Sequence, residues 1–145
     1  MHKPQAQVMD FHRALDIPVH FTPAIRRPEL RAELIREEAI ETIGAILGDD
    51  LVGAIDGLCD LLVVAYGAAL EFGIDLEPFF DEVHASNMAK QSGSVREDGK
   101  RLKPEGWLPP DIAGILQTGR GDISTDERRA FPEYGEARRT HVRAP

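Results

Sequence analysis

Two short acidic stretches decide how this chain folds and what chemistry it supports: EEAIE at residues 37–41 and DGLCD at residues 56–60. Each stretch contains carboxylates three or four residues apart, which share one face of a helix and repel one another. Apolar residues surround them, and an unpaired carboxylate in apolar surroundings is costly. Carboxylate oxygens are the ligands that Mg²⁺ and Mn²⁺ prefer. The stretches therefore predict a divalent metal site, with a solvated acidic face as the alternative.

Proline and glycine residues divide the chain into segments with a helical pattern. We expect helices over residues 5–15, 28–47, 50–72 and 75–90, then an irregular stretch and a short fifth helix over residues 110–117. Asp49 or Asp50 is expected to cap the third helix, and Asp75 the fourth. No segment shows the alternation of apolar and polar residues that is typical of a strand. The predicted fold class is all-α.

The turn at residues 48–50 is short, so the second and third helices are expected to pack antiparallel. Glu41 lies about eight residues before the turn centre and residues 56–60 follow it by seven to eleven, which brings the acidic stretches level. The third helix is apolar on nearly all sides from Leu58 onward, which favours a central position in a bundle. We expect a four-helix core whose bundle is completed by a homodimer.

Residues 1–117 are expected to form one domain and residues 118–145 a mobile tail or dimer arm. The second segment is rich in Gly, Arg, Glu and Pro and has few large apolar side chains, a composition typical of mobile segments. Phe131 and Tyr134 are its expected anchors. Inside the domain, the residues expected to pack in the core or between helices are Phe11, His12, Tyr66 and Gly67.

Charge is distributed unevenly. The net charge is −8, but residues 29–82 carry fourteen acidic and two basic residues. An acidic centre repels a nucleic-acid backbone, so a polymeric nucleic-acid partner is disfavoured. The longest apolar run, residues 61–70, is short for a membrane span, and residues 1–10 lack the pattern of a signal peptide. With a single cysteine, Cys59, the chain is expected to be cytoplasmic.

The acidic stretches resemble the signature of the all-α nucleoside triphosphate pyrophosphatases, the superfamily of MazG-like proteins, dimeric dUTPases and phosphoribosyl-ATP pyrophosphatases. That signature is EExxE, a gap, and then ExxD. Residues 37–41 complete the first half and Asp60 supplies the final acid, whereas Gly57 stands where the motif has Glu and Asp56 is the nearest substitute. The HxSNxxK stretch at residues 84–90 and the DGKxxKPxGW stretch at residues 98–107 resemble the MazG-like branch related to dimeric dUTPases.

The resemblance implies hydrolysis of a nucleoside triphosphate between its α and β phosphates, with Mg²⁺ as cofactor and Mn²⁺ as a substitute. It favours dUTP or dCTP and a role in nucleotide-pool control. The implied metal ligands are Glu38, Glu41 and Asp60, with Glu37 as a further ligand or the base, Glu38 as a second catalytic carboxylate, and Asp56 as a weaker fifth ligand. The implied phosphate-binding residues are Asn87, Lys90, Lys100 and Lys103. No residue reads a base unambiguously; Trp107 and His84 are weak candidates.

Other interpretations of these residues stay open. Lys90 near a helix C-terminus also stabilises the helix dipole without any ligand. Lys100 and Lys103 are also interpretable as exposed loop charges, and Trp107 as an anchor that pins its loop. A carboxylate-bridged di-iron bundle would need Glu-x-x-His pairs, and the sequence has none. A non-catalytic nucleotide or metal sensor of the same fold, weakened by Gly57, is the remaining alternative.

Overall fold

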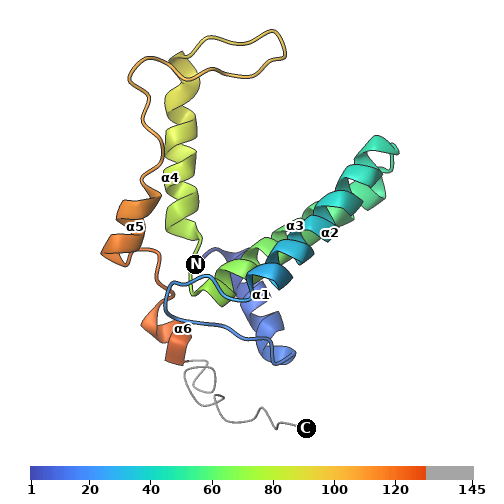
Figure 1. The fold of residues 1–145 in the computed structure, drawn as a ribbon, viewed down its shortest axis with the longest axis vertical. Helices are drawn as coiled ribbons and strands as arrows, with labels where there is room; N and C mark the ends of the chain where they lie inside the picture. The colour runs from blue at the N-terminus through green and yellow to red at the C-terminus, as the bar shows by residue number, and fades with distance from the viewer. Residues whose placement is uncertain (130–145) are drawn as a thin grey trace. The chain divides into compact units, whose positions relative to one another are not determined.

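The computed structural model describes residues 1–129, and these residues form helices without a regular strand (Figure 1). The all-α prediction is confirmed. The helices are α1 (Lys3–Ala14), α2 (Pro28–Leu47), α3 (Leu51–Phe72), α4 (Glu77–Met88), the 3-10 helix η1 (Ala89–Ser92), α5 (Ile112–Thr118) and α6 (Thr125–Arg129).

Helix ends follow the predicted capping chemistry in one case and not in another. The Asp50 side chain accepts a hydrogen bond from the Gly53 amide at 3.0 Å and caps α3, as predicted. The prediction that Asp75 caps the fourth helix is wrong, because α4 begins at Glu77 with Leu76 as its N-cap residue. Asp75 is instead buried, with Oδ2 3.0 Å from the amino group of Met1. An ion pair has therefore replaced the cap.

The described residues form two compact units. The first comprises residues 1–75 together with residues 122–129, and the second comprises residues 76–121. The first unit contains a core of Val8, Met9, Val19, Leu70 and Ile123, against which Tyr66 packs as predicted. Because Ile123 is buried in this core, the chain after the second unit contributes to the first one.

The segment predicted as a tail is described only in part. Residues 118–129 include the end of α5, the buried Ile123 and α6, which the sequence pattern did not predict. Phe131 and Tyr134, the expected anchors, lie outside the described residues. The boundary between a domain and a tail at residue 118 stays a prediction.

Helices α2 and α3 form an antiparallel hairpin, and α1 packs against α3 near its open end (Figure 1). The close approach of α2 and α3 depends on small residues at their interface. Gly57 and Thr42 are buried there, and a Cβ atom added to Gly57 would lie 2.5 Å from Thr42 Oγ1 and 3.0 Å from Thr42 Cα. Thr42 Oγ1 donates a 2.6 Å hydrogen bond to the Glu38 carbonyl, so its hydroxyl is satisfied inside this contact.

A buried ion-pair network joins α2 to the C-terminal end of α3. Glu71 is fully buried, and its Oε2 accepts hydrogen bonds from Arg31 Nε at 2.8 Å and from Arg27 Nε at 3.1 Å. Gly67 allows α1 to approach this network, because an added Cβ there would lie 3.1 Å from both Arg31 Nη1 and His12 Nε2. The predicted packing roles of His12 and Gly67 are confirmed. Breaking such a network by removing one partner is strongly destabilising.

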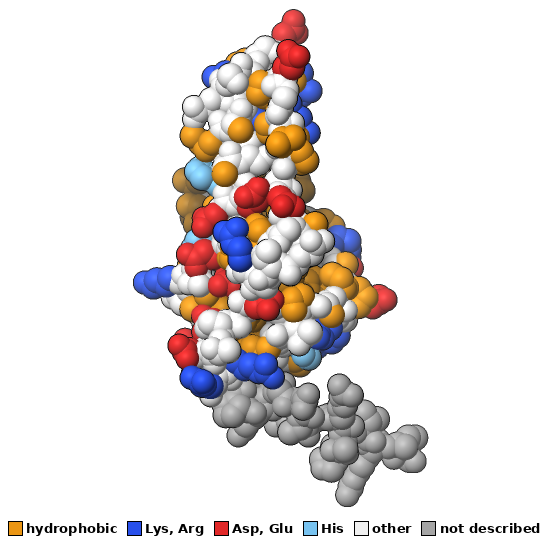
Figure 2. Space-filling model, turned by 90° about the vertical axis from the view of Figure 1, so that its left-hand side faces the viewer, with side chains coloured by type: hydrophobic (Ala, Val, Ile, Leu, Met, Phe, Trp, Pro, Cys, Tyr) orange, Lys and Arg blue, Asp and Glu red, His pale blue; other side chains and the backbone are white. Residues whose placement is uncertain are grey.

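Much of the apolar surface of the hairpin is exposed. At its closed end, Leu47, Leu51 and Val52 are 82%, 72% and 79% exposed. Phe11 is 48% exposed, so its predicted position in the core is wrong. By length and composition alone, α3 is long and apolar enough to cross a membrane, the only helix among residues 1–129 that is, and the core helix of a globular protein meets the same criterion. Figure 2 shows further apolar side chains on the surface of the second unit. The exposed large apolar residues of this unit include Phe80, Val83, Met88, Val95, Leu102 and Leu108.

Gly57→Ala is expected to lower the free energy of unfolding by about 1–2 kcal/mol, because the new methyl group overpacks the α2–α3 contact at Thr42. Gly44→Ala is the matched control: Gly44 has no atom within 4 Å of an added Cβ, and alanine favours the helix by up to about 1 kcal/mol. Urea denaturation of both variants measures the difference. Equal stability of the two would contradict the close contact.

His12 should make stability depend on pH. Burial, followed by the positive charge of Arg31, lowers the pKa of His12 from 6.5 to about 4. Between these pH values, His12 is protonated in the unfolded chain but neutral in the folded chain. The free energy of unfolding therefore falls as the pH falls from about 6.5 to about 4. We expect the advantage of the wild type over His12→Asn to shrink by about 3 kcal/mol across this window. Denaturation at several pH values, with His84→Asn as the control, tests the loss.

Candidate functional site

The hairpin brings the carboxylates of α2 and α3 into one electrostatic cluster. Glu38, half-buried on α2, has its pKa raised first by desolvation and then by the negative charges of Asp60, Glu41, Glu37 and Asp56, in that order. Two of these neighbours belong to α3, so carboxylates separated by the turn act on the same group. We call these five residues the carboxylate cluster. The predicted convergence of the two acidic stretches thus has a geometric basis in the hairpin.

Within residues 1–129, four of the five members of the carboxylate cluster have no basic partner. Among residues 1–129, no Lys or Arg forms an ion pair with Glu38, Glu41, Asp56 or Asp60. The two basic residues between positions 29 and 82 are engaged elsewhere: Arg31 pairs with Glu71, and Arg36 pairs with Glu33. The negative charge of these four carboxylates is therefore not balanced by an ion pair within residues 1–129.

The donor set of the cluster fits a hard divalent cation. Its ligand atoms are all carboxylate oxygens, which suit Mg²⁺ and Mn²⁺ better than softer metals. In the described part of the chain, the side chains do not place three such groups around one point. Glu38 and Glu41 lie three residues apart on α2, so a change of side-chain rotamer can bring their carboxylates together on one face of the helix.

Gly57 explains why the second acidic stretch departs from its motif. Its Cα faces Thr42 across the helix interface, so a glutamate at position 57 has no space in this packing. Asp56, one residue earlier, is exposed outside that contact. The negative charge of Asp60 raises the pKa of Glu38 more than the charge of Asp56 does. Of the two cluster members on α3, Asp60 therefore interacts more strongly with Glu38.

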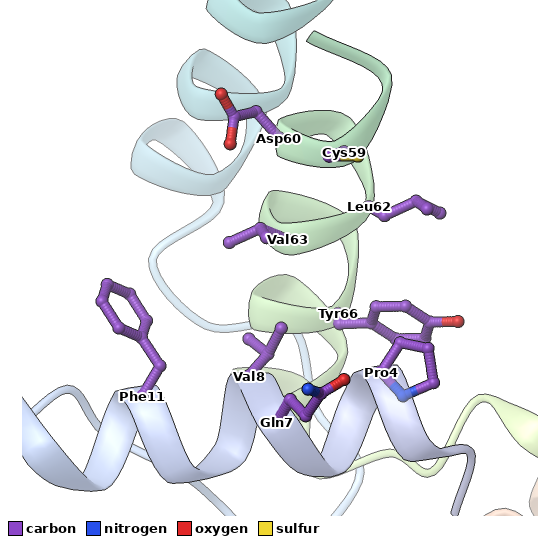
Figure 3. A pocket seen from close by; sticks show the side chains of 9 residues that line it. All are labelled: Pro4, Gln7, Val8, Phe11, Cys59, Asp60, Leu62, Val63 and Tyr66. Atoms are coloured by element: carbon purple, nitrogen blue, oxygen red, sulfur yellow. The ribbon is translucent and has the colours of Figure 1, made fainter. Parts of the chain in front are cut away.

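A groove of about 610 Å³ adjoins the cluster between α1 and α3 (Figure 3). Asp60 lies at its edge, and the aromatic rings of Phe11 and Tyr66 stand near opposite ends (Figure 3). Its lining is mostly apolar, consisting of Pro4, Gln7, Val8, Phe11, Cys59, Asp60, Leu62, Val63 and Tyr66. Its volume lies within the range found for small-molecule sites.

The second unit carries a separate group of polar and basic residues. Lys90 Nζ donates a 2.7 Å hydrogen bond to Asn87 Oδ1, so these residues share a face as predicted. Trp107 Nε1 donates to the Ser86 carbonyl at 2.9 Å, and the ammonium groups of Lys90 and Lys103 lie 5.3 Å and 4.0 Å from the centre of its ring. The structure thus brings together three of the four predicted phosphate-binding residues.

The remaining candidates of the second unit stand apart from this group. The Lys100 amide donates a 3.1 Å hydrogen bond to Asp98 Oδ1 within a turn, and no hydrogen bond or ring contact links its side chain to Trp107. His84 is exposed on α4. Neither residue gains support from the structure as a contact for phosphate or base.

The family model described as phosphoribosyl-ATP pyrophosphohydrolase matches residues 7–87, which is more than half of the chain. The chain belongs to the phosphoribosyl-ATP pyrophosphohydrolase family. This family is part of the MazG-like all-α nucleoside triphosphate pyrophosphatase superfamily, so the predicted superfamily is confirmed. The chain is accordingly a pyrophosphohydrolase that acts on a nucleotide-like substrate. No curated protein matches it.

The region shared with the phosphoribosyl-ATP pyrophosphohydrolase family contains the whole carboxylate cluster and most of the groove, but it ends at Asn87. Lys90, Lys103 and Trp107 lie beyond the match. Sequence reasoning missed the groove, because the apolar spacing of Phe11 and Tyr66 is the same for a core residue as for a residue that lines a binding site.

Proposed function

We propose that this chain is a metal-dependent nucleoside triphosphate pyrophosphohydrolase. Water attacks the α phosphorus, and the products are pyrophosphate and a nucleoside monophosphate. The observation that carries this proposal is the carboxylate cluster, in which charges from two helices act on Glu38 and no basic side chain pairs with its core within residues 1–129. A cluster of this composition is suited to a divalent cation and, through it, to a polyphosphate.

Glu38, Glu41 and Asp60 are the proposed ligands of Mg²⁺, with Mn²⁺ as a substitute. When bound, the ion supplies positive charge that offsets the charge of the triphosphate. Glu37 is exposed on α2 beside these ligands and is the proposed acceptor of the proton of the attacking water. Asp56 is a weaker fifth ligand, because its effect on Glu38 is smaller than that of Asp60.

The proposed substrates are dUTP and dCTP, which the resemblance to the branch related to dimeric dUTPases favours. Phosphoribosyl-ATP is the second candidate, because it gives the matching family its name. Housekeeping of the nucleotide pool is the corresponding role for a deoxynucleotide substrate. A panel of these nucleotides with Mg²⁺, scored for pyrophosphate and monophosphate, distinguishes the candidates.

We place the nucleoside part of the substrate in the groove between α1 and α3. Asp60 belongs both to the cluster and to the edge of the groove, so a nucleotide whose phosphates bind at the cluster can place its nucleoside in the groove. The rings of Phe11 and Tyr66 offer apolar surface to a base or sugar, and the Gln7 amide offers both a donor and an acceptor.

We also propose that the intact protein is a homodimer. The closed end of the hairpin exposes Leu47, Leu51 and Val52, and adjacent turns expose Ile43 and Ile55. A contiguous apolar surface of this kind on paired helices is typical of an interface rather than of a monomer surface. Sedimentation equilibrium measures the state, and a monomer at micromolar concentration would contradict this proposal.

Glu38→Gln is expected to lower pyrophosphate release in the presence of Mg²⁺ by at least about 100-fold, because it removes a charged ligand at the centre of the cluster. Glu33→Gln is the matched control, since Glu33 is an exposed carboxylate of α2 that pairs with Arg36. Excess chelator should abolish the activity of the wild type. Tight nucleotide binding by the wild type without pyrophosphate release would instead support the sensor alternative.

Phe11→Ala is expected to raise KM for the best nucleotide by about tenfold with little change in kcat, because it removes apolar contact with the nucleoside and not with the phosphates. Ile25→Ala is the control: Ile25 is 69% exposed and does not line the groove. Steady-state kinetics of the two variants decide the matter, and an unchanged KM in Phe11→Ala would exclude the groove as the nucleoside site.

A further inference from the structure

We infer that Trp107 is a positioning residue, whose indole ring holds Lys90 and Lys103 as a preformed clamp for a polyphosphate chain. This inference concerns the second unit alone. It rests on the proposed function for its biological ligand, a nucleoside triphosphate, but the clamp itself is testable by binding without hydrolysis.

The ring is fixed in place before any ligand arrives. Trp107 is half-buried, and its Nε1–H donates a 2.9 Å hydrogen bond to the Ser86 carbonyl of α4. From this position the ring centre lies 4.0 Å from Lys103 Nζ and 5.3 Å from Lys90 Nζ. Both distances are within the range over which the negative face of an indole attracts a cation. One aromatic ring therefore gathers two ammonium groups from different segments.

The gathered charges are not neutralised within the described chain. No carboxylate of residues 1–129 forms an ion pair with Lys90 or Lys103. The one hydrogen bond that the Lys90 ammonium donates goes to the uncharged Asn87 Oδ1. Two like charges near one ring repel each other. An anion that contacts both would relieve that repulsion.

The proposed ligand is a polyphosphate because one chain of phosphate groups offers several anionic oxygens. The ammonium groups of Lys90 and Lys103 lie 5.3 Å and 4.0 Å from the same ring centre, and we expect one such chain to contact both. Because Asn87 Oδ1 accepts from Lys90, the Asn87 amide nitrogen is directed away from that lysine and can donate to a third oxygen. The same contacts favour positioning of lysines over base stacking as the role of the Trp107 ring.

A purely structural role for Trp107 makes a different prediction. If Trp107 only anchored its loop through the hydrogen bond to Ser86, Trp107→Phe would weaken polyphosphate binding as much as Trp107→Leu, because neither side chain has an indole N–H. If the ring positions the lysines, phenylalanine retains an aromatic face and leucine does not. The pair Trp107→Phe and Trp107→Leu therefore separates the two roles.

The test is binding of inorganic tripolyphosphate to the full-length protein in excess chelator, so that no divalent ion can bridge the ligand to the carboxylate cluster. Trp107 is the only tryptophan, so its fluorescence reports binding to the wild type directly. Calorimetry measures the variants. We expect saturable binding by the wild type, a Kd within about threefold for Trp107→Phe, and a Kd weaker by about tenfold for Trp107→Leu and Lys103→Met. Lys3→Met, a lysine of α1, should bind as the wild type does.

Three results would overturn the clamp: no saturable binding by the wild type, a Trp107→Leu affinity equal to that of the wild type, or a Trp107→Phe affinity as weak as that of Trp107→Leu. Circular dichroism checks that each variant is folded. If Trp107→Leu does not fold, Lys103→Met provides the test. This variant keeps Trp107, so a fluorescence titration gives its Kd for tripolyphosphate, which must be about tenfold weaker than that of the wild type. If tripolyphosphate binds with the predicted affinities but no nucleotide releases pyrophosphate, the clamp is supported and the proposed hydrolysis is refuted.

Discussion

The close packing of α2 against α3 at Gly57 and Thr42 is the constraint on which the site depends. Helices that meet through a glycine approach more closely than helices that meet through larger side chains, and here an added methyl group would already contact the backbone of the partner helix. This proximity lets Asp60 act on Glu38 across the hairpin. It also leaves no space for a glutamate at position 57, where the pyrophosphatase motif has one. The same contact thus assembles the carboxylate cluster and leaves position 57 without a carboxylate.

The distribution of ion pairs makes the cluster chemically available. In a folded protein, acidic groups are usually balanced by nearby basic groups, and an unbalanced cluster destabilises the fold unless an ion occupies it. This chain has two arginines in its acidic centre, and both are used for structure: Arg31 in the buried network around Glu71, and Arg36 in a surface pair with Glu33. The structural ion pairs and the carboxylate cluster therefore use separate charged residues of α2 and α3.

Sequence pattern predicted the backbone of this site well, because its signals are local. Pro28 and Gly48 gave the bounds of α2, and the two acidic stretches indicated both the hairpin and the superfamily. Long-range contacts were not predictable in this way. Asp75 has the sequence context of a helix cap, but it pairs with a distant amino group, and Phe11 has the spacing of a core residue, but it lines a groove. Burial of Ile123 likewise depends on where the chain returns after the second unit.

The distribution of charge along the sequence also bears on the proposed binding of a triphosphate. Carboxylates alone repel a polyphosphate, and a divalent ion reverses this only for the oxygens that it contacts. Further cations are needed for the rest, and the acidic first unit has committed its central arginines to ion pairs. The lysines around Trp107 lie beyond the segment matched by the family model, and they are the cations that we propose for this role. The proposed metal ligands lie inside the segment that the family model matches, and the proposed phosphate-binding lysines lie beyond it, so the two kinds of charge belong to different parts of the sequence.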